Sequence, residues 1–114
     1  MSERPLGVLA TVGKDGTPHA TPVEVVVHDG KVHAWSQERS VKVKNVKRSG
    51  RAAMLVYKGH DFALVRGPAR LIRARDAGYE EITRAFLTKY NRDETYGNDV
   101  LVQISPEHVA TREA

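Results

Sequence analysis

The sequence predicts a mainly β protein, built as a small closed antiparallel barrel with two appended helices. Most of the first half consists of short apolar stretches separated by tight turns, and two of those turns are Asp-Gly pairs at residues 15–16 and 29–30. Only two segments change to the periodicity of a helix. The resulting order is three strands, a helix, two strands, a helix and one strand. Short connections between antiparallel strands favour a six-stranded barrel that closes on itself.

The first three predicted strands form a meander of two hairpins. Strands are expected over Leu6–Val12, Ala20–His28 and Val32–Ser36. Pro22 lies inside the second of these strands. Because proline has no N–H to donate to a sheet ladder, we expect a sheet edge or a bulge at this residue.

Two helices and three further strands complete the prediction. Ser40 and Gly50 are expected to begin and end a short helix, because serine caps a helix start and glycine adopts the left-handed conformation that ends one. A longer helix is predicted from Asp76 to about Asn91, where Tyr79, Ile82, Phe86 and Tyr90 recur at spacings of three and four. The remaining strands are expected over Arg51–Tyr57, over Phe62–Arg73 with a bend at Gly67-Pro68, and over Asp99–Ser105.

Length and composition limit the classes of protein that need to be considered. The 114 residues fit one domain spanning residues 1–114. Cysteine is absent, which excludes disulfides, thiolate metal sites and cysteine nucleophiles. The amino terminus has no signal-peptide character, and no apolar stretch approaches the roughly 20 residues of a membrane span. We therefore expect a soluble cytoplasmic protein with no membrane partner.

The strongest functional signal is a run of basic residues around the first predicted helix. Six cations occur between residues 39 and 51 with no acid among them: Arg39, Lys42, Lys44, Lys47, Arg48 and Arg51. The unpaired N–H groups at a helix start attract phosphate, and Ser40 and Lys42 would be added donors there. The alternative is a solvated helix face, although a purely structural surface helix usually mixes charges of both signs.

No group of side chains in the sequence indicates catalysis without a cofactor. There is no nucleophile elbow, no phosphate-binding glycine-rich loop and no dinucleotide fingerprint. The five histidines have no carboxylate at a ligand-like spacing, so no metal site is expected. Catalytic residues stay unassigned, and a bound cofactor would have to supply the chemistry of an enzyme.

Several short motifs extend over nearly the whole chain. They are Leu9-Ala10-Thr11-Val12, Asp15-Gly16-Thr17-Pro18-His19, Thr21-Pro22-Val23, the segment 42–48, Arg51-Ala52-Ala53, Val65-Arg66-Gly67 and the segment 100–109. In this order they resemble the split-barrel flavin-binding superfamily that includes pyridoxamine 5′-phosphate oxidase. The resemblance implies an FMN-binding split barrel. The Lys-x-Lys-Asn pattern at residues 42–45 and the ending with Pro106 are similar to the deazaflavin (coenzyme F420)-dependent oxidoreductases of the B group.

The resemblance implies a homodimer with the cofactor held in a groove between the subunits. Lys42 and Asn45 would hold the phosphate region, with Lys44 nearby. The other implied contacts are Thr21, Pro22 and Val23 along the edge of the ring, Trp35 and Ser36 on the path to the phosphate, and His60 and Phe62 reaching the ring from the partner subunit. The implied reaction transfers a hydride from reduced F420 to an unsaturated small-molecule substrate, and the proton comes from solvent or from His60.

Other interpretations are a barrel of the same fold that uses FMN, and a non-catalytic flavin, deazaflavin or haem-type binding protein. A nucleic-acid-binding barrel would need exposed aromatic side chains near the cations, and only Trp35 qualifies, so no nucleic-acid partner is expected. Two departures from the family pattern also matter. Arg39 is displaced by one position, which leaves its contact with phosphate open. The extra carboxy-terminal segment of pyridoxamine 5′-phosphate oxidases is lacking, so that activity is not expected.

Overall fold

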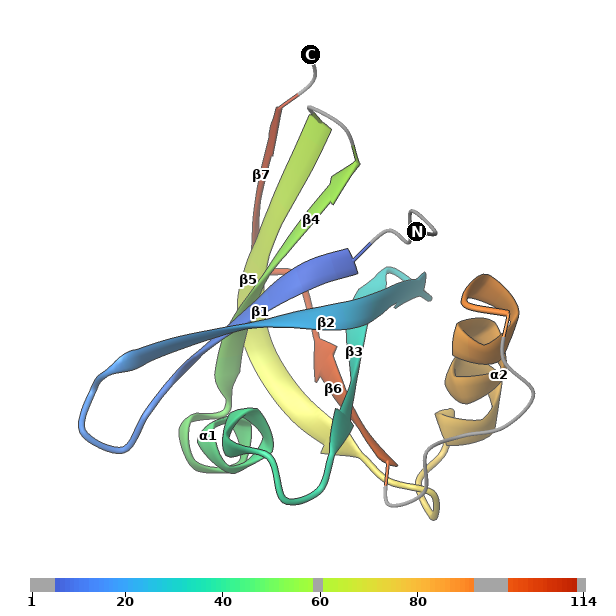
Figure 1. Ribbon diagram of the computed structural model, residues 1–114, viewed down its shortest axis with the longest axis horizontal. Coiled ribbons are helices and arrows are strands. Elements are labelled where there is room, and N and C mark those ends of the chain that lie inside the picture. The colour runs from blue at the N-terminus through green and yellow to red at the C-terminus, as the bar shows by residue number, and fades with distance from the viewer. Residues whose placement is uncertain (1–5, 59–60, 92–98, 113–114) are drawn as a thin grey trace.

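The computed structural model describes residues 6–58, 61–91 and 99–112, and it confirms a mainly β barrel with two helices (Figure 1). The elements in chain order are β1 (Leu6–Val12), β2 (Pro18–His28), β3 (Lys31–Gln37), α1 (Val41–Ser49), β4 (Arg51–Lys58), β5 (Asp61–Ile72), α2 (Tyr79–Lys89), β6 (Asp99–Ile104) and β7 (His108–Arg112). Six strands follow one another in the order β4-β1-β2-β3-β6-β5, all antiparallel, and the pairing of β5 with β4 closes the barrel.

The strand β7 was not predicted from the sequence. It pairs with Phe62–Arg66 of β5, whereas β6 pairs with Ala69–Ile72, so β6 and β7 lie end to end along the same neighbour. Pro106 separates them, and most of the β7 side chains are exposed, which removes the alternation that identifies a strand. The predicted bend at Gly67-Pro68 is the place where β5 changes partner while continuing unbroken. A side chain at residue 67 would lie 2.2 Å from the Ser105 carbonyl oxygen, so this crossing requires glycine.

Helix α2 is shorter than predicted at both ends. It begins at Tyr79 rather than Asp76, because the Asp76 carboxylate accepts a hydrogen bond from the Arg73 backbone N–H (2.8 Å) and residues 76–78 form a turn. It ends at Lys89, and Asn91 has a positive φ of 52°. The predicted apolar face is confirmed.

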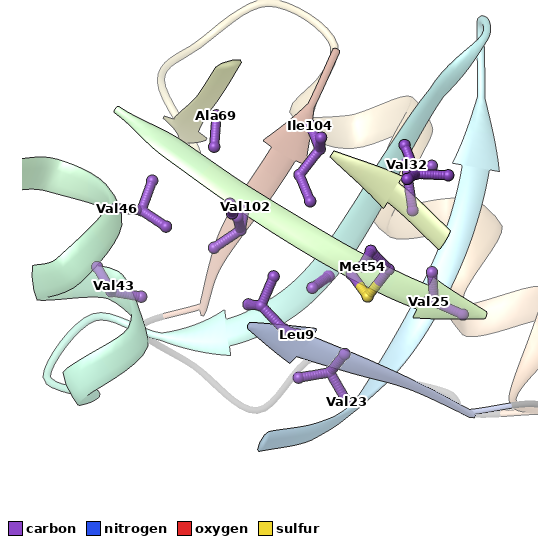
Figure 2. Close-up of a cluster of buried hydrophobic side chains, with 13 residues drawn as sticks. Leu9, Val23, Val25, Val32, Val43, Val46, Met54, Ala69, Val102 and Ile104 are labelled. Carbon is purple, nitrogen blue, oxygen red and sulfur yellow. The ribbon is translucent and has the colours of Figure 1, made fainter. Parts of the chain in front are cut away.

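Two clusters of buried side chains hold the elements together. One fills the barrel, includes Leu9, Val25, Met54 and Ile104, and receives Val43 and Val46 from α1 (Figure 2). The second lies between the outer face of the sheet and α2: Val26, Trp35, Ile72, Ile82, Phe86, Tyr90 and Leu101. The Tyr90 hydroxyl also accepts a hydrogen bond from the Val25 N–H (2.9 Å) and donates one to the Val25 carbonyl oxygen (3.2 Å). Helix α2 is therefore anchored to β2 by hydrogen bonds as well as by apolar packing.

A line of polar groups crosses the sheet beside the second cluster. Arg70 Nε donates to Gln103 Oε1 (2.8 Å), and Gln103 Nε2 lies 3.0 Å from His33 Nε2. Since the glutamine amide donates, His33 Nε2 accepts, and His33 Nδ1 donates to the Val26 carbonyl oxygen (3.3 Å). His33 is fully buried, and that burial lowers its pKa to about 4. The network requires a neutral imidazole.

We predict that stability falls on mild acidification through His33. Its folded-state pKa lies below the ordinary value of 6.5, so the stabilisation is complete above pH 6.5 and is lost as the pH falls toward 4. Between pH 7 and pH 5 the loss should be about 2 kcal/mol, measured by urea unfolding. His33→Gln should remove most of this dependence, whereas His19→Gln, at an exposed histidine, should keep it. Parallel pH profiles for wild type and His33→Gln would contradict this assignment.

Candidate functional site

The barrel is split where β3 diverges from β2. These strands pair only over Val25–His28 of β2, although β2 itself continues back to Pro18 along β1. The end of β3 pairs with β6 instead, through Ser36 with Val100. From Pro18 to Glu24, one edge of β2 therefore faces no other strand within the described part of the chain. Pro22 lies in this segment, which confirms the sheet edge expected there.

Helix α1 begins at the mouth of this split, directly after β3 (Figure 1). The Ser40 N–H donates to the Gln37 carbonyl oxygen (3.0 Å), which makes the connection a tight turn. The Ser40 hydroxyl accepts a hydrogen bond from the Val43 N–H (3.4 Å), and Gly50 ends the helix with a φ of 69°. Both predicted caps are confirmed. The amino-terminal end of α1, with its positive dipole, is thus held beside the end of β3.

Two predicted residues near this helix end carry polar groups that bind no partner among the described residues. Ser36 is 4% exposed, and its Oγ has no hydrogen bond among the described residues. Lys42 is partly buried, and burial alone lowers the pKa of its ammonium group. A buried hydroxyl and a half-desolvated cation each cost free energy when unpaired. An anionic group bound at this helix end would relieve the cost at Lys42, and a ligand acceptor that reached Ser36 would satisfy its hydroxyl.

Asn45, by contrast, uses its side chain to hold α1 in place. It is 3% exposed, its Nδ2 donates to Thr11 Oγ1 of β1 (3.0 Å), and its Oδ1 accepts from Arg48 Nη1 (3.4 Å). Arg48 also donates to the Val12 carbonyl oxygen. The structure therefore engages both ends of the Asn45 amide inside the chain.

Lys44 lies in a hollow between α1 and the turn of the β1–β2 hairpin. The hollow has a volume of about 760 Å³ and is lined by Gly13, Lys14, Asp15, His19, Val41, Lys44, Asn45 and Arg48. Its one acid, Asp15, accepts a hydrogen bond from the Thr17 N–H (3.0 Å), which lowers the pKa of the carboxyl group. Cations predominate around this hollow, so an anion is the ligand that it would attract.

The other predicted site residues are not all brought together. Thr21 and Val23 lie on the open segment of β2. Trp35 points to the face of β3 opposite Ser36 and packs against Phe86, with ring centroids 5.0 Å apart. Phe62 lies on the arm formed by β4, β5 and β7, which extends away from α1 (Figure 1). His60 falls outside the described residues.

An apolar row crosses the outer face of five strands, and it was not predicted from the sequence. The register aligns Pro22, Val8, Leu55, Leu64 and Ala110, which we call the outer row. Leu64 is 40% exposed, and Tyr57, which shares the face of Leu55, is 46% exposed. The sequence does carry a signal for this row. In β1, β4 and β5, apolar residues occur on both faces of the strand, and not only on the face that lines the barrel.

A second hollow, of about 660 Å³, adjoins the outer row. Its floor consists of small residues such as Ala10 and Ala53, and its rim carries Arg66 and an ion pair between Arg51 and Glu107 (2.8 Å). Within the described residues, no group of three or more potential metal ligands occurs, and no helix is long and apolar enough to cross a membrane.

A family model described as pyridoxamine 5′-phosphate oxidase matches residues 1–113. The chain belongs to this family. No curated protein matches it. Among solved structures, a protein of unknown function from Agrobacterium tumefaciens superposes with a TM-score of 0.82 and 16% identity over 96% of this chain, which spans only 51% of that protein.

Two further solved structures of similar fold carry names that state different functions, one a reductase and the other a storage protein. An F420 reductase has a TM-score of 0.75 at 21% identity, covering 95% of this chain and 91% of that one. The haem storage protein HutZ from Vibrio cholerae has a TM-score of 0.80 at 12% identity, covering 95% of this chain and 86% of that one. At such identities the likeness shows the shared fold alone.

We predict that Asn45→Ala destabilises this family member by about 1–3 kcal/mol, because it leaves the buried Thr11 hydroxyl without its partner. Lys44→Ala, at the exposed neighbouring position, should change the free energy of unfolding by less than about 0.5 kcal/mol. Chemical denaturation measures both. Equal stabilities for the two variants would show that the Asn45 contacts do not fix the helix.

Proposed function

We propose that this protein is an F420-dependent oxidoreductase of the B group, which transfers a hydride from reduced deazaflavin to an unsaturated small molecule. One observation carries the proposal: the unpaired Ser36 hydroxyl and the half-buried Lys42 ammonium lie near the capped start of α1, beside the open edge of β2. These groups suit the phosphate of a cofactor. The family membership and the F420 reductase of the same fold support the choice of cofactor class.

The open edge of β2 suits the ring of such a cofactor. In the β1–β2 register the backbone groups of Thr21 and Val23 face Leu9 and Gly7 of β1. The groups turned toward the open edge belong to the alternate residues, and the Ala20 N–H with the Ala20 and Pro22 carbonyl oxygens would bind the polar edge of a flat ring. The basic hollow beside Lys44 and Arg48 would receive further acidic groups of the cofactor. Reduced deazaflavin supplies the hydride, and this chain would bind, orient and exclude water.

The working unit in this proposal is a homodimer that pairs through the outer row. A barrel of 114 residues has little room to enclose a tricyclic ring, and the outer row leaves apolar side chains such as Leu64 exposed. A second copy covering this face would bring Phe62 toward the cofactor of the first. The proton of the reduction would come from solvent or from His60.

A second candidate is a non-catalytic binding protein, which the similarity to the haem storage protein favours. The same barrel with FMN is the nearest alternative, since both cofactors present a phosphate. Fluorescence quenching with F420 and with FMN separates the cofactors, and preferential binding of FMN would overturn our choice. Loss of reduced-cofactor absorbance with a panel of enones and quinones indicates an enzyme. Tight binding without turnover indicates the carrier.

We predict that Lys42→Ala weakens cofactor affinity by about 1.5–3 kcal/mol, or roughly 10- to 150-fold, because a hydrogen bond to a charged group is lost. Lys47→Ala is the matched control, since it removes the same charge from the last turn of the same helix. Fluorescence titration measures both dissociation constants. If the two variants lose affinity equally, the effect is overall charge, and Lys42 is not a ligand.

We also predict that Leu64→Glu gives a monomer that binds cofactor poorly, because a charge in the outer row disfavours the paired state. Val27→Glu serves as the control, because Val27 is 66% exposed and lies outside the outer row. Analytical ultracentrifugation combined with cofactor titration reports both properties. A wild-type protein that sediments as a monomer at all concentrations would refute the dimer.

A further inference from the structure

A two-pronged ion pair anchors the connection between β3 and α1. Arg73, at the end of β5, donates from Nε to Glu38 Oε1 (2.8 Å) and from a second nitrogen to Glu38 Oε2 (2.9 Å). The Arg73 side chain is 25% exposed, and its backbone N–H is bound by Asp76. The pairing lowers the pKa of the Glu38 carboxyl, chiefly through the Arg73 hydrogen bonds. Arg73 is thus fixed at both ends, and it fixes Glu38 in turn.

Glu38 is the acid that stands closest in sequence to the start of the basic helix. It precedes Lys42 by four residues, and no other acid occurs between residues 38 and 60. Even so, the two side chains form no ion pair in the described structure, and burial alone shifts the pKa of Lys42. Carboxylates are stabilised at helix starts and beside lysines, so an unheld Glu38 would be attracted to this helix end.

We propose that Arg73 is a positioning residue, which holds the Glu38 carboxylate away from Lys42 and so keeps the start of α1 open to an anion. The inference rests on the proposed function. Without Arg73, the released carboxylate would occupy the place of the cofactor phosphate and repel it. The ion pair therefore acts by removing a competing negative charge, in addition to any contribution to stability.

Four proteins test this proposal: wild type, Arg73→Met, Glu38→Gln and the double variant. Methionine keeps the packed apolar stem of Arg73 while removing the guanidinium. Arg73→Met should bind the cofactor about tenfold more weakly, the effect of one uncompensated charge near the phosphate. Glu38→Gln should bind as tightly as wild type, and the double variant should return to within about twofold of wild type. Arg84→Ala, at an exposed arginine on α2, is the charge-matched control.

If the Glu38–Arg73 ion pair has only a structural role, the cofactor affinities of the variants follow a different pattern. If the ion pair only holds the connection in shape, Glu38→Gln weakens binding as much as Arg73→Met, and the double variant is not rescued. Either of those results, or full affinity in Arg73→Met, would overturn the proposal. Failure of wild type to bind either F420 or FMN would instead refute the proposed function.

A measurement on the cofactor-free protein tests the role of Arg73 separately from the proposed function. The pKa of the Lys42 ammonium group can be measured by NMR in the free protein. In Arg73→Met it should rise, because the Glu38 carboxylate then lies beside it, and in the double variant it should return to the wild-type value. A Lys42 pKa that is the same in Arg73→Met and wild type would overturn the proposal, whatever the protein binds.

Discussion

The separation of β3 from β2 is the constraint on which the site depends. Beyond Val25 and toward Pro18, β2 keeps β1 as its neighbour, while the end of β3 continues along β6. This divergence leaves one edge of β2 open, directs the chain into α1 at the mouth of the split and places the Ser36 hydroxyl in the interior without a partner. If β3 stayed paired with β2 along its whole length, the backbone N–H and C=O groups on the open edge of β2 would be hydrogen-bonded to β3. That edge would then have no free groups to bind a ligand.

Polar contacts, which could not be predicted from the sequence, hold helix α1 beside the split. Asn45 and Arg48 bind it to β1, and the Glu38–Arg73 pair fixes the turn that precedes it. Among the described residues, no ion pair engages Lys42 at the helix start, Lys44 beside the hairpin hollow or Lys47 in the last turn. The segment therefore keeps a positive field that includes the helix start and the hollow, where an anion can reach it.

Most of the fold could be predicted from the sequence because the strands are punctuated by Asp-Gly turns and α1 carries clear caps at Ser40 and Gly50. The strand β7 could not, because its pairing with β5 depends on a long-range contact across Gly67 rather than on a local pattern. For the candidate site, the basic segment pointed to α1, the helix on which the proposed site is built. The sequence could not distinguish Lys42, which stays unpaired, from Asn45, which is engaged within the fold. That difference is set by tertiary contacts with Thr11 and Arg48.

In the proposed function, the mouth of the split receives the charged end of a cofactor. A crystal structure of the protein grown with F420 tests this most directly. We expect density for the phosphate within hydrogen-bond distance of Lys42 Nζ and Ser36 Oγ, with the ring along Thr21–Val23. Cofactor bound elsewhere on the barrel, or a split filled by the protein's own side chains, would contradict it.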